Sequence, residues 1–103
     1  MNNDLRARVS GVVVDAGHGG DDPGAVSNGL REKDFTLEAA KYLYQRLKEL
    51  GIPVAITRDT DRTLSREERI NTMVNSFGNG RDVLVLSNHI NSGGAEFSYH
   101  YII

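Results

Sequence analysis

Short apolar runs alternate with stretches of helical periodicity along this chain of 103 residues. The apolar runs at 11–15, 53–57 and 83–86 are rich in β-branched or aliphatic residues and predict β-strands. Apolar residues recur at helical spacing over 34–50 and 65–77. Because strands that alternate with helices build parallel sheets through right-handed crossovers, the pattern predicts an α/β fold. We expect a mostly parallel sheet with helices packed on it and a site at the C-terminal edge of the strands.

The ends of both helices carry local signals. Asp34 is a suitable N-cap for the first helix, and Gly51 suits the left-handed position just after its end. Ser65 and Glu68 have the spacing of a capping box at the start of the second helix. The sequence therefore predicts both ends of the first helix and the start of the second.

Composition limits the classes of protein to which the chain can belong. Hydrophobic residues make up 39% and charged residues 25%, which is ordinary for a single globular domain. The net charge is −2 and no basic block occurs, so we expect no nucleic-acid partner. No apolar stretch is long enough to span a membrane, and the first ten residues carry no export signal. With no cysteine, the metal ligands available are His, Asp and Glu.

The end of the chain is an apolar, aromatic segment at 97–103 that could begin a fourth strand. No helix follows it to cover the next face of the sheet. We therefore expect a domain that lacks its C-terminal part. An exposed last strand is prone to pair with another copy, so self-association is also expected.

Polar residues gather where the predicted strands end. His18 follows the first strand, His89 follows the third, and Glu32 lies just before the first helix. These three side chains converge at one edge if the first and third strands are neighbours. Two imidazoles and one carboxylate are the ligand set of a catalytic zinc, which acidifies its water and polarises a carbonyl. The set therefore suits hydrolysis of an amide.

Other interpretations of these residues exist. A single loop histidine is more often a surface residue than a ligand, and His100, between two tyrosines, is given no functional role. The run DAGHGG after the first strand could instead bind phosphate, although neither G-x-x-x-x-G-K-[ST] nor G-x-G-x-x-G is present. Arg58 could bind a substrate carboxylate, but an arginine in a loop is by default a solvated surface charge. The charged residues at 66–69 are expected to form the first turn and the solvent-exposed face of the second helix.

Several segments together resemble one known family, the zinc-dependent N-acetylmuramoyl-L-alanine amidases that act on bacterial cell walls. The matching segments are VVVDAGHGGDDPGAVSNGLREKDF, ITRDTDRTLSREER and VLVLSNHINSGGAE. Any one of them alone is a weak signal, whereas the combination is specific.

The resemblance implies a site, a reaction and a location. It makes His18, Glu32 and His89 the ligands of one zinc ion and implies hydrolysis of the amide between N-acetylmuramic acid and L-alanine in peptidoglycan. Family members include phage lysins (endolysins), autolysins and sporulation or germination enzymes, which implies an extracellular or cell-wall location. On this basis, residues 1–103 are expected to form a single amidase catalytic domain.

The sequence also departs from the family. In the family, the glutamate that acts as general base lies beyond the segments that match. No residue of this sequence is assignable to that role, and we do not assign it to Glu96. A catalytically impaired fragment that binds zinc or the wall is therefore the alternative.

Overall fold

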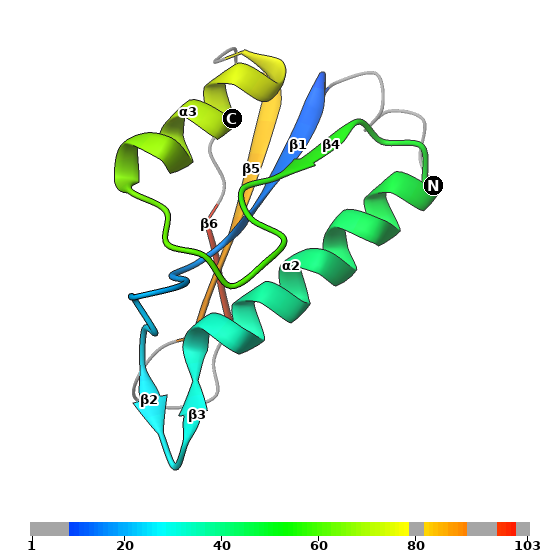
Figure 1. Ribbon diagram of the computed structural model, residues 1–103. Helices are drawn as coiled ribbons and strands as arrows, with labels where there is room; N and C mark the ends of the chain where they lie inside the picture. The colour runs from blue at the N-terminus through cyan, green and yellow to red at the C-terminus, as the bar shows by residue number, and fades with distance from the viewer. Residues whose placement is uncertain (1–8, 79–81, 91–96, 101–103) are drawn as a thin grey trace.

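The computed structural model describes residues 9–78, 82–90 and 97–100, which form a four-stranded sheet with a helix on each face (Figure 1). The strand order is β4 (Val54–Ile56), β1 (Gly11–Ala16), β5 (Val83–Ile90) and β6 (Phe97–His100). Strand β1 is parallel to both β4 and β5, whereas β6 is antiparallel to β5. The predicted mostly parallel α/β sheet is therefore confirmed, with one antiparallel strand at its edge.

Strands β1 and β5 are direct neighbours. Their register runs from Gly11 opposite Val83 to Ala16 opposite Asn88. All of β1 is buried, as expected for a central parallel strand covered on both faces. The loops that follow β1 and β5 therefore leave the same edge of the sheet side by side.

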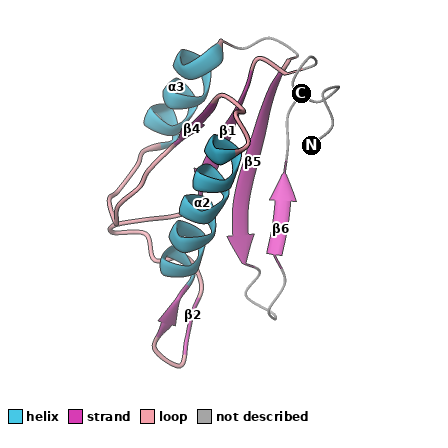
Figure 2. Ribbon diagram, turned by 90° about the vertical axis from the view of Figure 1, so that its right-hand side faces the viewer, coloured by secondary structure: helices cyan, strands magenta, loops and turns pink. Residues whose placement is uncertain are grey.

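The two helices cover opposite faces of the sheet (Figures 1 and 2). Val12, Val14 and Ala16 point to the face covered by α2 (Glu32–Glu49), where they form the core. Gly11 faces α3 (Arg66–Phe77), since a side chain added there would meet the Phe77 ring. The remaining core comes from both the helix and the flanking strands: Ala40, Leu43, Leu47, Leu50, Ile52, Val54, Ile56, Leu84 and Leu86.

Helix α2 begins three residues earlier than the predicted cap at Asp34 implies. Asp34 is not its N-cap; the helix starts at Glu32, and Arg31 occupies the cap position without a side-chain hydrogen bond. The Glu32 and Lys33 N–H groups instead donate to the backbone carbonyls of Ala25 and Pro23, at 2.8 and 3.0 Å. Because the preceding loop satisfies these donors, no capping side chain is required. Glu32 is thereby part of the helix, not of the loop before it.

The other predicted boundaries agree more closely with the structure. Gly51 follows α2 with φ 76°, and the capping box of Ser65 and Glu68 is present at the start of α3. Strand β5 is longer than predicted, because it pairs with β6 over the segment that was expected to be a loop. His89 therefore lies on a strand, where it is paired with Ser98 of β6.

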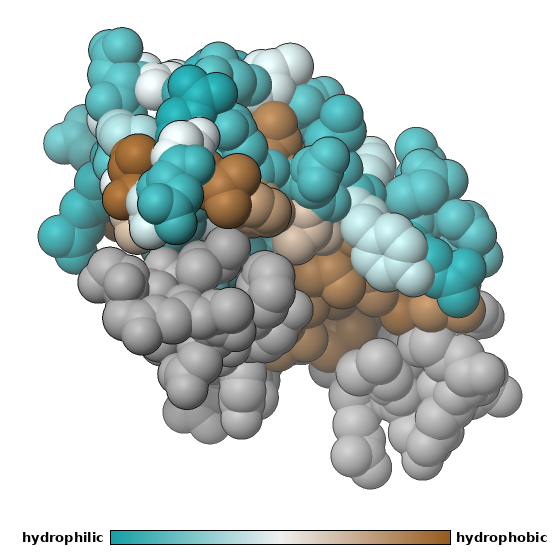
Figure 3. Space-filling view, turned by 90° about the horizontal axis from the view of Figure 1, so that it is seen from below, coloured by the Kyte–Doolittle hydropathy of each residue, from teal (hydrophilic) through white to brown (hydrophobic). Residues whose placement is uncertain are grey.

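A small hairpin joins the loop after β1 to helix α2. It consists of β2 (Val26–Ser27) and β3 (Leu30–Arg31) and projects from the rest of the molecule (Figure 1). Val26 and Leu30 are exposed on it. Seen from this end, apolar residues gather in the middle of the surface, with hydrophilic residues above and beside them (Figure 3). Among the described residues, no helix is long and apolar enough to cross a membrane.

Candidate metal centre

The loop after β1 turns sharply at His18. His18 has φ 63°, a left-handed conformation that is uncommon for any residue except glycine, and Gly19 and Gly20 continue it with φ 131° and 57°. Glycine adopts such angles without steric cost, as the sequence led us to expect. The turn directs the His18 ring toward the start of α2. A non-glycine residue in this conformation often marks a functional position.

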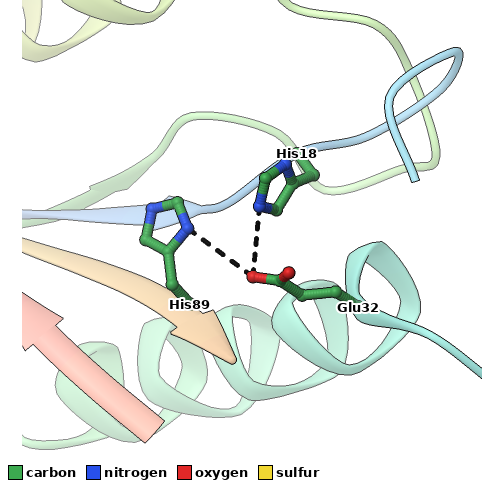
Figure 4. Close-up of side chains that lie close together, drawn as sticks. All are labelled: His18, Glu32 and His89. Carbon is green, nitrogen blue, oxygen red and sulfur yellow. Dashed lines mark ion pairs between the residues drawn. The ribbon is translucent and has the colours of Figure 1, made fainter. Parts of the chain in front are cut away.

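The structure brings His18, Glu32 and His89 together, although they come from a loop, a helix and a strand (Figure 4). One Glu32 carboxylate oxygen, Oε2, lies 3.1 Å from His18 Nε2 and 3.6 Å from His89 Nδ1. One ligand atom from each of the three residues lies within 4.8 Å of the others. The Glu32 side chain is only 5% exposed, whereas those of His18 and His89 are 26% and 36% exposed. The cluster thus has a buried floor and an open side.

The far side of each residue in this cluster is held by another group. Glu32 Oε1 accepts a hydrogen bond from the Ala25 N–H at 3.0 Å. His18 Nδ1 lies 2.8 Å from Asp22 Oδ2, and this hydrogen bond is the main cause that lowers the pKa of Asp22. His89 Nε2 lies 3.1 Å from Ser87 Oγ. All three side chains therefore present a defined atom to the centre of the cluster.

Asp22 and Ser87 are functional candidates that the sequence analysis did not identify. Ser87 is two residues before His89, so both lie on the same face of β5. Asp22 is four residues after His18 in the same loop. The strand periodicity was a usable signal for Ser87, whereas nothing local predicts that the loop folds Asp22 back onto His18.

Arg58 is not the solvated charge that the sequence suggested. It is 2% exposed, and its guanidinium donates to the carbonyls of Ala16, Gly17 and His18 at 2.8–3.2 Å. It also donates to the carbonyls of Thr60 and Lys33 and to Thr36 Oγ1. Burial is the main cause that lowers its pKa. Arg58 therefore holds together the loop that carries His18 and the start of α2.

Arg69 likewise leaves the predicted solvent face of α3. Its guanidinium pairs with the buried Asp15 carboxylate and donates to the carbonyls of Ala16 and His18. Asp15 also accepts from Thr57 Oγ1 at 2.9 Å and Ser87 Oγ at 2.6 Å. A carboxylate with these three partners anchors the end of β1.

Three consecutive backbone donors of the loop after β1 already have protein acceptors, which argues against the phosphate-loop interpretation. The N–H groups of Gly19, Gly20 and Asp21 donate to the Asp22 carbonyl, Asp61 Oδ1 and Thr63 Oγ1. A phosphate cradle needs such groups to point at the ligand. The loop is built around protein acceptors instead.

Glycines allow the backbone to approach the cluster closely. A Cβ on Gly17 would lie 2.6 Å from the Asn88 carbonyl oxygen and 2.7 Å from the His89 ring. A Cβ on Gly24 would lie 2.7 Å from both Glu32 Oε1 and the His18 ring. The packing around the three residues leaves no room for larger side chains.

Among the residues that the structure describes, the other polar residues predicted at this edge do not join the cluster. Asn88 is fully buried, and its carboxamide has no hydrogen-bond partner among the described residues. Asp59 is exposed. Asn91, Glu96 and the side chain of His100 lie outside the part of the molecule that the structure describes.

Removing the charge of Asp61 should change the acid dependence of stability. The hydrogen bond from Lys33 Nζ, at 2.9 Å, is the main cause that lowers the pKa of Asp61. A carboxylate with a depressed folded-state pKa stabilises the fold above its unfolded pKa of 3.8, and this contribution is lost as the pH falls through the lower, folded value. Asp61→Asn should therefore be less stable than the parent at about pH 6, with a difference that shrinks by about pH 3. Urea unfolding at both pH values measures this, and a difference independent of pH would contradict it.

The sequence of the chain matches a known protein family. A family model described as N-acetylmuramoyl-L-alanine amidase matches residues 12–101. The uncharacterized protein YqiI of Bacillus subtilis is 44% identical over 87 residues, covering 84% of this chain and 40% of that protein. The sporulation-specific N-acetylmuramoyl-L-alanine amidase of the same organism is 39% identical over 93 residues, covering 88% and 35%. The chain thus spans well under two thirds of the length of these relatives.

Solved structures give the same result. N-acetylmuramoyl-L-alanine amidase AmiC2 of Nostoc punctiforme superimposes with a TM-score of 0.69 at 33% identity, covering 78% of this chain and 43% of that one. The catalytic domain of CwlV, an amidase from Bacillus (Paenibacillus) polymyxa, gives a TM-score of 0.69 at 36% identity and covers 78% and 44%. The described fold is therefore the fold of part of these catalytic domains.

Proposed function

Because the chain belongs to the N-acetylmuramoyl-L-alanine amidase family, we propose that it hydrolyses the amide between N-acetylmuramic acid and L-alanine in peptidoglycan. Water would add across this bond, giving a lactyl carboxylate and a free L-alanine amine. The bond lies in the cell wall, so we place the activity there, outside the cytoplasmic membrane. The observation that carries the proposal is the convergence of His18, Glu32 and His89 at the edge of the sheet.

We further propose that these three residues hold one zinc ion. Two ligand atoms at about 2.0–2.1 Å from zinc, in a tetrahedral arrangement, lie about 3.4 Å apart. The distances of 3.1 and 3.6 Å from Glu32 Oε2 to the two imidazole nitrogens are close to this value. A neutral imidazole nitrogen and a carboxylate oxygen are both acceptors, and such contacts need a cation or a proton between them. The donor set fits zinc, because two histidines and one glutamate are the protein ligands of a known class of catalytic zinc site.

The residues around that ion would have different roles. Zinc supplies a Lewis acid that polarises the scissile carbonyl. Buried Glu32 fixes the floor of the site, and the partly exposed histidines leave the opposite side open to a polymeric substrate. Arg58 and Arg69 hold the carbonyls of the loop from both sides, which keeps His18 in place.

Metal content and bond cleavage should be measured on the same preparation. We expect elemental analysis to find one zinc per chain, and we expect peptidoglycan treated with the loaded chain to gain free L-alanine amines. New reducing ends should not appear, because no glycosidic bond is cut. The matched control is Asp59→Asn, which removes an exposed carboxylate at the same edge but outside the cluster.

The outcomes separate the two parts of the proposal. One zinc per chain with no released amine would contradict the activity and support the alternative, a catalytically impaired zinc-binding fragment. Released amines that persist after a chelator has removed all metal would contradict the role of zinc. No bound zinc would contradict the ligand assignment.

Gly17→Ala should weaken zinc binding. The added Cβ would lie 2.6 Å from a backbone oxygen, so the His89 ring or the strand must move. Overpacking of this kind costs about 1–3 kcal/mol, and a displaced ligand would reduce zinc affinity by roughly 10–100-fold if that cost falls on the site. Competition with a chelating dye measures the affinity. Gly29→Ala on the hairpin is the control: φ is 78° there, so alanine strains the backbone, but its Cβ has nothing within 4 Å, and zinc affinity should stay that of the parent.

A further inference from the structure

A short chain of hydrogen bonds leads from His89 into the protein on the face covered by α3. His89 Nε2 lies 3.1 Å from Ser87 Oγ, which in turn lies 2.6 Å from Asp15 Oδ2. Asp15 is 3% exposed and is paired with Arg69, so it is a carboxylate that accepts hydrogen bonds and donates none. The single hydroxyl proton of Ser87 is therefore directed to Asp15.

This direction decides the protonation of the His89 ring. With its proton engaged by Asp15, Ser87 Oγ can only accept from His89 Nε2. The proton of a neutral imidazole is then on Nε2, and the lone pair is on Nδ1. Nδ1 is the atom that faces Glu32, at 3.6 Å.

The other histidine is held in the opposite way. Both nitrogens of His18 face carboxylate oxygens: Nδ1 lies 2.8 Å from Asp22 Oδ2, and Nε2 faces Glu32. With a metal cation between Nε2 and Glu32, the proton of this ring is on Nδ1, where Asp22 accepts it. Its lone pair is on Nε2, which lies 3.1 Å from the same Glu32 oxygen. Both lone pairs therefore point to one place, although they belong to different atoms of the two rings.

We propose that Ser87 is a positioning residue that, held by Asp15, fixes His89 as the Nε2-protonated tautomer, while Asp22 fixes His18 as the Nδ1-protonated tautomer. This inference rests on the zinc site of the proposed function. It adds that the two imidazoles bind through different nitrogens, and that Ser87 selects the nitrogen of His89 before the metal arrives. Such partners set the orientation and basicity of a ligand, and their loss typically reduces metal affinity roughly 10–100-fold.

Nitrogen-15 spectroscopy of the histidine rings tests this directly. Long-range proton–nitrogen spectra should be recorded on the zinc-loaded chain and on the metal-free chain at about pH 9, well above the ordinary histidine pKa of about 6.5. We expect His89 to carry its proton on Nε2 in both samples, and His18 to carry its proton on Nδ1 in the loaded one. His89 protonated on Nδ1 in either sample would overturn the proposal. If zinc fails to bind, the proposed function fails, and the metal-free spectrum still decides the tautomer of His89.

Variants at Ser87 supply the second readout. Ser87→Ala should weaken zinc binding roughly 10–100-fold and give a mixture of His89 tautomers in the metal-free chain. Ser87→Thr keeps the hydroxyl and should restore both properties. Ser76→Ala is the matched control, because it removes a serine hydroxyl that bonds only to the Thr72 carbonyl within α3. An Ser87→Ala chain with the parent's zinc affinity and a pure Nε2-protonated His89 would refute the role of Ser87.

Discussion

We expect His18→Ala and His89→Ala each to abolish stoichiometric zinc binding and to leave the helical content of the chain unchanged. Each removes one of the three protein groups that converge at the edge of the sheet. Two remaining ligands hold zinc poorly, so the loss should exceed the roughly 10–100-fold that follows removal of a partner behind a ligand. Neither histidine contributes to the core, so the fold should persist. Elemental analysis and circular dichroism of each purified variant measure the two properties.

Two further variants make this result specific. His18 has a left-handed backbone that alanine adopts with difficulty, so His18→Asn is the better-matched replacement, since asparagine tolerates that conformation. It should also lose zinc. His100→Ala should keep one zinc per chain, because the sequence gives His100 no part in the site. One zinc retained in both His18→Asn and His89→Ala would disprove the ligand set.

The parts of this fold that follow from nearby residues could be predicted from the sequence. The apolar run of β1 and the capping box at Ser65 each depend on neighbours a few residues away, and the structure confirms both. The convergence of His18 and His89 needed only one long-range condition. That condition, that β1 and β5 are neighbours, is met.

The predictions that were wrong concern residues whose partners are distant in the sequence. Asp34 looks like a helix cap, but carbonyls of the preceding loop already satisfy the first N–H groups of α2. Arg58 looks like a surface charge, but three of its acceptors are carbonyls about 40 residues away in sequence, which no local pattern reveals. The convergence of the three candidate ligands was therefore easier to predict than the residues that hold them in place.

The largest change in stability should come from a substitution that keeps the charge. Arg58→Lys retains a cation, but an ammonium cannot reproduce the planar fork that contacts five carbonyls and the Thr36 hydroxyl. Other donors still reach these carbonyls, such as Arg69 at Ala16 and His18, but several hydrogen bonds to a charged group would be lost, at about 1.5–3 kcal/mol each. We expect the free energy of unfolding to fall by about 3–5 kcal/mol in urea melts, which is a large share of the stability of a small domain.

The matched control for Arg58→Lys is the same substitution on the surface. Arg46 is about half exposed on α2 and makes one ion pair, with Glu49 at 3.2 Å. Arg46→Lys should change stability by less than about 0.5 kcal/mol, because exposed pairs contribute little. Since the Arg58 fork binds the carbonyls of Gly17 and His18, Arg58→Lys should also weaken zinc binding under conditions in which the chain is still folded. A folded Arg58→Lys chain with the parent's stability and zinc affinity would show that the charge of Arg58, rather than its shape, is what the loop requires.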